Sequence, residues 1–357
     1  MKDIYKILVI TSTFPKNEVD PVPTFVKEQI ISLKSKYPFI NFHVLAPSTK
    51  GKIPYTEYVN YNETRFRYFI NKFEILNTYG LISSIKRNKF LIFLLPLYLI
   101  SLIYNSIKVC LKFKPDLVYV HWVTPQAIIA LLLKKLFRVN YVFSTHSNDA
   151  LILTKFIGGT ALLNSVVKNS HAFISDSKAI ESNLKKHIKE KNWDLCKSNI
   201  LTMGVNSNKF KNQDEDLSDR LSNLNDKIII SFIGRFVEKK GVENLIKIFY
   251  RILKKYPGCH LLICGQGPLV SDYKYLINNY KIGDSVSILN FFNDDKKLTS
   301  VYKFTDIIIV PSIQTEKGET EGVPVSLLES LHNGKLVVAS VQSNAKDVIE
   351  NDKNGLL

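Results

Sequence analysis

The chain has 357 residues, which is too long for one typical hydrophobic core and predicts two domains. With 45% hydrophobic and 22% charged residues, its composition is that of a folded protein and excludes a disordered or collagen-like chain. The four cysteines, Cys110, Cys196, Cys259 and Cys264, show no Cys-x-x-Cys spacing. They are predicted to be reduced, mostly buried thiols of a cytosolic protein.

The net charge of +16 is concentrated in the first part of the chain. Residues 1–210 hold 29 Lys and Arg against 13 Asp and Glu, whereas residues 211–357 hold 19 of each. A one-sided positive field indicates an anionic partner. Lys outnumbers Arg by 25 to 4 in residues 1–210, which favours an anionic membrane surface over nucleic acid, since base readout depends on Arg. The alternative is that a Lys-rich chain is simply basic.

Two apolar runs bear on targeting. Residues 7–10 are too few for the apolar region of a signal peptide. Residues 90–104 give about 15 apolar positions interrupted by Pro96, short of the ~20 that span a bilayer. This segment is therefore predicted to be a buried or membrane-surface helix.

The first half opens with a strand at 5–10, a helix from Thr24 and a strand at 41–47, which is a Rossmann-like beginning. The loop 11–23 then lies at the carboxyl end of the first strand, where such folds bind ligands. The aromatic and basic stretch 50–80 is either an insert that recognises a ligand or a peripheral hairpin. Further strands are expected at 115–121, 141–145 and 173–177, with helices at 90–112, 125–137 and 178–190.

His146 ends one of these strands and precedes a polar turn that contains Asp149. A single His at a strand end is more often structural than functional, so the interest of His146 depends on the motifs that follow it. His121, at the end of another strand, and Asp149 are weaker candidates. The polar stretch 207–226 is predicted to be a linker between the domains.

The second half begins with a buried strand at 227–233 that ends in Gly234-Arg235 and continues to Lys240-Gly241. Arg235 and Lys240 can bind one anion from two sides of this loop, Arg through paired hydrogen bonds and Lys as a point charge. A second strand, 260–264, ends in Gly265, and a third, 287–292, contains Phe291. Residues 293–295 are predicted to cap a helix, in preference to holding a metal.

Two glutamates, Glu321 and Glu329, stand eight positions apart after a strand at 306–312. Pro324 suits the first position of a helix. The free amides of that helix's first turn, at residues 322–326, form a site for an anion. Glu321 is expected at the mouth of this site, with Glu329 about two turns further along the same side.

In their order, these motifs resemble the retaining glycosyltransferases of family 4, which have the GT-B fold. The resemblance covers essentially the whole chain and implies an α/β protein of two Rossmann-like domains facing each other across a cleft. The expected domains are 1–206 on the acceptor side and 227–357 for the nucleotide sugar, the latter lacking its last helices. The implied activity is that of a hexosyltransferase-type enzyme with a nucleotide-diphosphate sugar as co-substrate and neither a cofactor nor a metal.

The resemblance also assigns roles to residues. The implied catalytic set is His146, Arg235, Lys240 and Glu321. The implied donor-binding set is Gly234, Arg235, Lys240, Gly265, Phe291, Glu321, Gly322, Val323, Pro324, Val325 and Glu329. The acceptor is expected to be a lipid-linked glycan at the inner face of the cytoplasmic membrane, in the synthesis of bacterial surface polysaccharide or lipopolysaccharide.

The chain departs from the family pattern in two of its motifs. Ser147 stands where the family has Gly in its His-Gly-x-Asp pattern, and Thr24-Phe25 replaces the common Gly-Gly, which leaves the acceptor-side contacts open. Alternatives also remain: an inactive, truncated binding subunit, which the early end of the donor domain suggests, a GT-B nucleotide-sugar epimerase or phosphorylase, and a nucleic-acid-binding protein.

Overall fold

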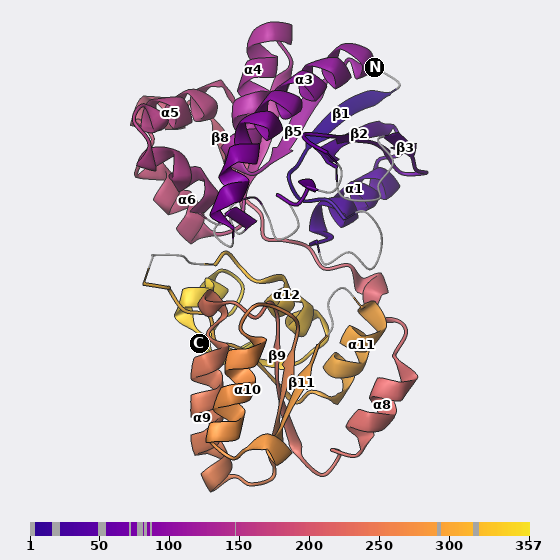
Figure 1. Cartoon of the computed structure of the whole chain (residues 1–357), viewed down its shortest axis with the longest axis vertical. Coiled ribbons are helices and arrows are strands. Elements are labelled where there is room, and N and C mark those ends of the chain that lie inside the picture. The colour runs from indigo at the N-terminus through magenta and orange to yellow at the C-terminus, as the bar shows by residue number, and fades with distance from the viewer. Residues whose placement is uncertain are drawn as a thin grey trace. The chain divides into compact units, whose positions relative to one another are not determined.

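A computed structural model describes residues 4–15, 22–48, 55–70, 73–76, 81, 84–85, 88–146, 148–290, 294–316 and 321–357. The chain forms two compact units, residues 1–201 and residues 202–357, called here the first and the second unit. Each contains one sheet with helices on both faces, as the α/β class predicts (Figure 1).

The first unit contains an eight-stranded sheet of order β3-β4-β2-β1-β5-β6-β7-β8. Its pairings are parallel except for the antiparallel pair β3–β4. The strands are β1 (Tyr5–Ile10), β2 (Ile40–Pro47), β3 (Tyr55–Glu57), β4 (Asn62–Phe66), β5 (Leu117–His121), β6 (Asn140–Thr145), β7 (Ala172–Ser175) and β8 (Lys197–Ile200). The described part of the 50–80 stretch therefore contains a hairpin at the sheet edge, one of the two alternatives.

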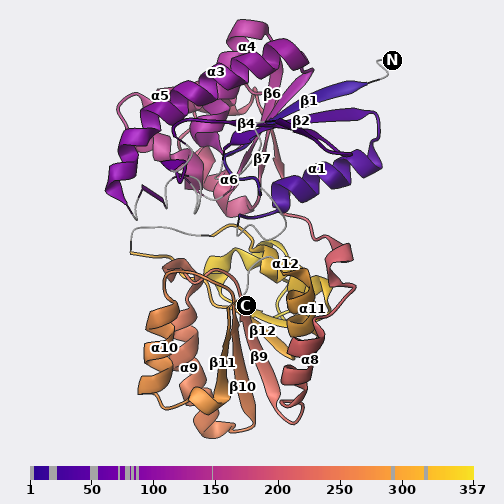
Figure 2. The ribbon, with the colours of Figure 1, turned by 45° about the vertical axis from the view of Figure 1, so that its right-hand side comes forward.

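The helices of the first unit cover both faces of this sheet (Figure 2). Side chains of a strand alternate between faces, so Val9 packs with Val26 and Ile30 of α1, whereas Leu8 and Ile10 share a core with the other helices. The helices are α1 (Phe25–Lys36), α3 (Leu95–Phe113), α4 (Ile128–Phe137), α5 (Gly159–Asn169), α6 (Lys178–Lys185) and α7 (Glu190–Trp193).

Two of these helices can be compared with the sequence expectation. Helix α4 itself begins at Ile128, and residues 125–127 belong to the helical turn η3 (Val123–Ala127) that leads into it, in which only Thr124 has a non-helical backbone. The 3₁₀ turn η2 (Lys89–Leu94) runs directly into α3, and together they give a helical stretch of 25 residues. This stretch agrees with the helix predicted at 90–112. Pro96 lies in the first turn of α3, where it does not break a helix.

The second unit contains a parallel five-stranded sheet of order β11-β10-β9-β12-β13. Its strands are β9 (Ile228–Ile233), β10 (Cys259–Cys264), β11 (Val286–Leu289), β12 (Ile307–Val310) and β13 (Leu336–Ala339). Its helices are α8 (Glu215–Ser222), α9 (Val242–Lys255), α10 (Val270–Asn279), α11 (Asp295–Phe304) and α12 (Val325–His332).

Residues 207–226, the predicted linker, include a 3₁₀ turn, Ser207–Phe210, and helix α8. The buried Leu217 and Leu221 of α8 pack in a cluster with Val301 of α11. Apolar residues at this spacing give the helix one buried face, so this segment belongs to the packed part of the second unit.

Candidate active site

In the second unit, the loops that follow β9, β10 and β12 meet at the carboxyl edge of the sheet. The amide of Gly234 donates to the carbonyl of Cys264 (3.0 Å), and the amide of Phe236 donates to the carbonyl of Gln266 (2.9 Å). The amide of Ile313, after β12, donates to the carbonyl of Lys239 (2.9 Å). The edge where α/β folds bind ligands is therefore built from three interlocked loops.

Two glycines permit this close approach. Gly241 has a φ of 68°, and a Cβ there would lie 1.9 Å from the carbonyl oxygen of Pro311. Gly265 has a φ of 141°, and a Cβ there would lie 1.9 Å from the carbonyl oxygen of Gly234. A side chain at either position would force two backbones apart, so glycine is required on steric grounds.

The centre of this edge is an ion pair between two predicted site residues. The ammonium of Lys240 lies 2.8 Å from a carboxylate oxygen of Glu321, and that of Lys239 lies 3.5 Å from the other. The hydroxyl of Ser312 donates to the same carboxylate at 3.0 Å. The side-chain amide of Asn344 donates to the backbone carbonyl of Glu321. Glu321 is therefore held from four sides.

Burial alone would raise the pKa of Glu321, but the ion pairs with Lys240 and Lys239 outweigh it and hold this pKa below its ordinary value. The carboxylate is therefore ionised at neutral pH. It forms a close ion pair with Lys240 and a longer contact, of 3.5 Å, with Lys239. An anionic group entering here meets two lysines and one carboxylate.

The remaining donor-site predictions fall on the loop after β9 and on helix α12. Arg235 follows Gly234, and its side chain is exposed. Gly322, Val323 and Pro324 form the turn that leads into α12, whose first residue is Val325. Pro324 is the cap of α12 and not its first helical residue, because its ψ of 139° is extended. The amides at the start of α12 have no partner within the helix.

Glu329 lies inside the unit. Its side chain is buried, with 7% exposed, and a carboxylate oxygen accepts a hydrogen bond from the hydroxyl of Tyr302 on α11 (3.3 Å). Burial, with Glu329 beside it, raises the pKa of Tyr302 well above its ordinary value, so this hydroxyl keeps its proton. Glu321 and Glu329 are thus fixed by different partners. Phe291 lies outside the described residues.

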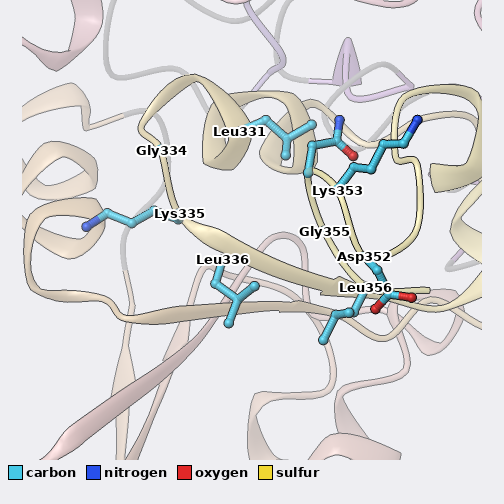
Figure 3. A pocket seen from close by; sticks show the side chains of 9 residues that line it. Leu331, Gly334, Lys335, Leu336, Asp352, Lys353, Gly355 and Leu356 are labelled. Atoms are coloured by element: carbon cyan, nitrogen blue, oxygen red, sulfur yellow. The ribbon is translucent and has the colours of Figure 1, made fainter.

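A separate groove of about 610 Å³ lies in the second unit, and it is lined by none of the predicted site residues (Figure 3). Its lining includes Leu336, at the start of β13, and Leu356, whose backbone pairs with Val338 in parallel. The predicted site lies at the carboxyl edge of the sheet, and this groove involves the opposite end of β13. This groove is therefore separate from the predicted donor site.

In the first unit, His146 is paired with a second histidine, His121. His121 ends β5, His146 follows β6, and their ring nitrogens Nδ1 and Nε2 are 3.0 Å apart. The two rings are nearly parallel, at 13°. The rings of Phe25 and Trp122 lie 5.0 and 5.1 Å from that of His146. Phe25, which replaces the common glycine, therefore adds an aromatic wall to this pair.

Asp149 holds the backbone around this pair. One carboxylate oxygen accepts from the amide of His146 (3.2 Å), and the other accepts from the amide of Val123 (2.6 Å). Trp122, which directly precedes Val123, has a φ of 74°, an uncommon value for a bulky residue and one that often marks a functional site. Among the described residues, Nε2 of His121 and Nδ1 of His146 are buried and have no hydrogen-bond partner.

Burial makes both rings neutral. It lowers the pKa of His146 to about 3, and it lowers that of His121 well below its ordinary value, with a further contribution from His146. In the 3.0 Å contact, one ring nitrogen therefore carries a proton and donates a hydrogen bond, and the other ring nitrogen accepts that hydrogen bond. His146 can present either a donor or an acceptor to a substrate, but no positive charge.

The first unit is expected to lose stability as the pH falls. Histidines in an unfolded chain titrate near 6.5, whereas in the fold the pKa of His146 is about 3 and that of His43 about 4, both through burial. Below pH 6.5 the unfolded chain therefore binds more protons than the folded one, and acid favours unfolding. Asp149, whose pKa burial raises to about 6, acts in the opposite direction and offsets part of this effect.

This expectation can be measured as the change in melting temperature between pH 7 and pH 5. The double variant His121→Asn, His146→Asn should show a smaller change than the parent chain, because two of the groups that resist protonation are gone. His171→Asn, at an exposed position, is the matched control. An equal acid-induced loss in the double variant and the parent would contradict the expectation.

Several residues of these two sites were missed by the sequence analysis. Ser312 and Asn344 follow β12 and β13, and Phe25 follows the loop after β1. Their position after strands of parallel sheets was the available signal, since carboxyl ends of parallel strands share one edge. Lys239 adjoins a predicted residue, and His121 was a weaker candidate. The structure gives both direct contacts with the sites.

Two family models match the chain. "Glycosyltransferase Family 4" matches residues 40–195, and "Glycosyl transferases group 1" matches residues 213–357. The amylovoran biosynthesis glycosyltransferase AmsK of Erwinia amylovora is 31% identical over 162 residues, which are 45% of this chain and 38% of that protein. The putative colanic acid biosynthesis glycosyltransferase WcaL of Escherichia coli is 28% identical over 125 residues, 35% and 30% of the two chains. The matches thus span about a third of these relatives.

Solved structures match nearly the whole chain. Anabaena Alr3699/HepE in complex with UDP has a TM-score of 0.67 at 14% identity. The match covers 99% of this chain and 85% of the HepE chain. The E. coli trehalose-6-phosphate structure bound with UDP-2-fluoro glucose has a TM-score of 0.68 at 14% identity and covers 95% and 85%. The solved structures show the GT-B fold. The two family models, which match successive parts of the chain, show that it belongs to the group 1, or family 4, glycosyltransferases.

Proposed function

We propose that this chain transfers a sugar from a nucleotide-diphosphate donor to a glycan acceptor in the synthesis of a bacterial surface polysaccharide or lipopolysaccharide. The observation that carries the proposal is the Lys240–Glu321 pair at the carboxyl edge of the second sheet, beside Arg235 and the first turn of α12. Support comes from HepE, which was solved with UDP and with UDP-glucose, and from AmsK and WcaL, which are named for polysaccharide synthesis.

In this proposal, the second unit binds the donor. Arg235, Lys240 and the first amides of α12 stabilise the diphosphate as negative charge develops on it. Glu321 accepts hydrogen bonds from the sugar hydroxyls, and Glu329 from the ribose. Gly234 and Gly265 let the backbone approach the nucleotide. No metal is invoked, because two cationic side chains are available to neutralise the leaving diphosphate.

The transfer retains the anomeric configuration. The bond between the anomeric carbon and the diphosphate oxygen breaks, and the acceptor oxygen forms a bond to that carbon from the same face. The acceptor proton passes to the leaving phosphate oxygen, so no separate base is required. His146, neutral through burial, provides a hydrogen bond to the sugar and orients its reacting face.

The excess charge of residues 1–210 supports a location on an anionic membrane surface, where a lipid-linked acceptor would be available. The protein is thus proposed to be cytoplasmic and peripheral on the inner face of the cytoplasmic membrane. The partners are a nucleotide sugar, a lipid-linked glycan and the membrane, and none is a nucleic acid.

Calorimetric titration of UDP and GDP, with and without EDTA, tests the donor site. One of the two nucleotides is expected to bind, with an affinity that EDTA leaves unchanged within about twofold, because side chains and not a metal neutralise the diphosphate. Binding of neither nucleotide would contradict the proposal. A loss of binding in EDTA would contradict the metal-free site alone.

A further inference from the structure

The helical stretch η2–α3 of the first unit has a continuous apolar side that faces solvent. Phe90 and Phe93 are 80% and 75% exposed, and Ile100 and Tyr104 are 64% and 62% exposed. With the exposed Leu97 and Leu111, these positions follow one another at spacings of three, four and seven residues. That spacing keeps them on one side of a helix, in a line about 30 Å long. We call these six residues the α3 ridge.

A second element extends the α3 ridge sideways. The segment after β4 carries exposed Phe69, Ile70, Phe73 and Ile75. It lies beside α3, because the hydroxyl of Ser101 donates to the carbonyl of Arg67 at 2.5 Å. Isolated exposed apolar residues are ordinary, but a contiguous patch built from two elements marks an interaction surface.

The charges around the α3 ridge are of one sign. Between Glu74 and Asp116 the sequence contains no acidic residue, while it contains Lys86, Arg87, Lys89, Lys108, Lys112 and Lys114. Of these, Lys89 and Lys108 are exposed on η2–α3 itself, and Lys135 is exposed on the neighbouring α4. Glu74, in the segment after β4, is buried. An apolar stripe on a helical stretch that itself carries exposed lysines and no carboxylate has the chemistry of a helix that lies in the surface of an anionic bilayer.

The opposite side of α3 excludes a simple crossing of the membrane. By length and composition alone the stretch Lys89–Phe113 could cross one. However, Tyr98 and Leu102 are fully buried in the core, and the ring of Tyr98 lies 5.2 Å from that of Phe66 on β4. Figure 2 shows α3 lying along one face of the sheet. A crossing would strip α3 from this sheet and expose the core beneath it.

We propose that the α3 ridge inserts into the surface of an anionic phospholipid bilayer, with Lys89, Lys108 and Lys135 contacting its phosphates. This inference deepens the proposed function, since it names the surface that meets the membrane, and it depends on the proposed membrane location but not on the sugar chemistry. The ridge sits on the first unit, so the donor site of the second unit needs no change for the chain to bind lipid.

Flotation with vesicles of phosphatidylglycerol and phosphatidylcholine tests the inference. The parent chain is expected to float with them, and the variant Phe93→Ser, Ile100→Asn, Tyr104→Ser to lose at least about tenfold in partitioning, because its inserted area is gone. Lys89→Gln, Lys108→Gln and Lys135→Gln should each cost roughly fivefold. The matched control is Ile248→Asn, Tyr275→Ser, which replaces residues of similar exposure in the second unit, 52% and 66%.

Each other outcome would overturn the inference. Equal flotation of the ridge variant and the parent would place the contact elsewhere, and no flotation of the parent would remove the lipid partner. Concentration-dependent self-association that the ridge variant abolishes would identify a second copy as the occupant. Resistance to alkaline carbonate extraction would indicate a crossing helix. The circular dichroism spectrum and melting temperature of the same variants show whether they are folded. Titration of the nucleotide that the parent binds separates failure here from failure of the donor site.

Discussion

Replacement of Lys240 by methionine is expected to weaken binding of the nucleotide that the parent chain binds, UDP for example, by roughly 10- to 100-fold. The lost charge-assisted hydrogen bond is worth about 1.5–3 kcal/mol. The carboxylate of Glu321, now without the ammonium 2.8 Å away, would also repel the diphosphate. Methionine keeps the length and most of the apolar stem of lysine, so the packing of the loop is preserved. Calorimetry measures the effect, and Lys274→Met, at an exposed position on α10, is the control.

Glu321→Gln is expected to change the binding of UDP and of UDP-sugar differently from Lys240→Met. It releases Lys240 for the diphosphate, so UDP itself is expected to bind as well as before or a few-fold more tightly. UDP-sugar should lose the part of its affinity that depends on the sugar, because glutamine accepts hydrogen bonds less strongly than a carboxylate. Equal binding of UDP by the parent and Lys240→Met would show that this loop is not the diphosphate site.

Stability separates these binding effects from unfolding. Either single change leaves a mostly buried charge with one partner fewer, which destabilises a fold. The double variant Lys240→Met, Glu321→Gln removes both charges and should recover part of the melting temperature without recovering UDP affinity. Recovery of both would mean that the single variants failed to bind because they were unfolded.

Replacement of His146 by alanine is expected to slow turnover by about 100-fold, the scale of one lost hydrogen bond to a transition state. UDP binding should stay unchanged, because the proposed diphosphate contacts belong to the second unit. The effect should therefore appear in kcat and leave the UDP titration intact. Release of UDP from a UDP-sugar, with a membrane lipid extract as the acceptor source, is the measurement.

His121 should act through His146, since its Nδ1 lies 3.0 Å from Nε2 of that ring. His121→Ala removes the partner that fixes the ring and its tautomer, and a loss of about tenfold in kcat is expected, smaller than that of His146→Ala. His121→Asn keeps one hydrogen-bonding group and should recover part of the rate. A His146→Ala variant with the parent's kcat would contradict the role proposed for this pair.

The local sequence determined most of the fold. Runs of apolar residues such as 228–233 form parallel strands, because strands covered on both faces need no polar side. The loop Gly234 to Gly241 was predicted by its own residues, since Gly241 allows the close backbone contact with Pro311 that the structure shows. One helix boundary shifted by a residue, because the extended backbone at Pro324 makes it the cap of α12 and the helix begins at Val325.

Tertiary structure alone decided what each charged or polar group contacts. Lys240 and Glu321 are far apart in sequence, and nothing in either segment indicates that they pair or that Ser312 joins them. His121 and His146 end neighbouring strands, and their 3.0 Å contact follows from the register of β5 with β6. The sequence by itself determined which residues stand at strand ends, because apolar periodicity is local. Their pairing, burial and pKa values arise from contacts between distant segments, which only the packed sheets bring together.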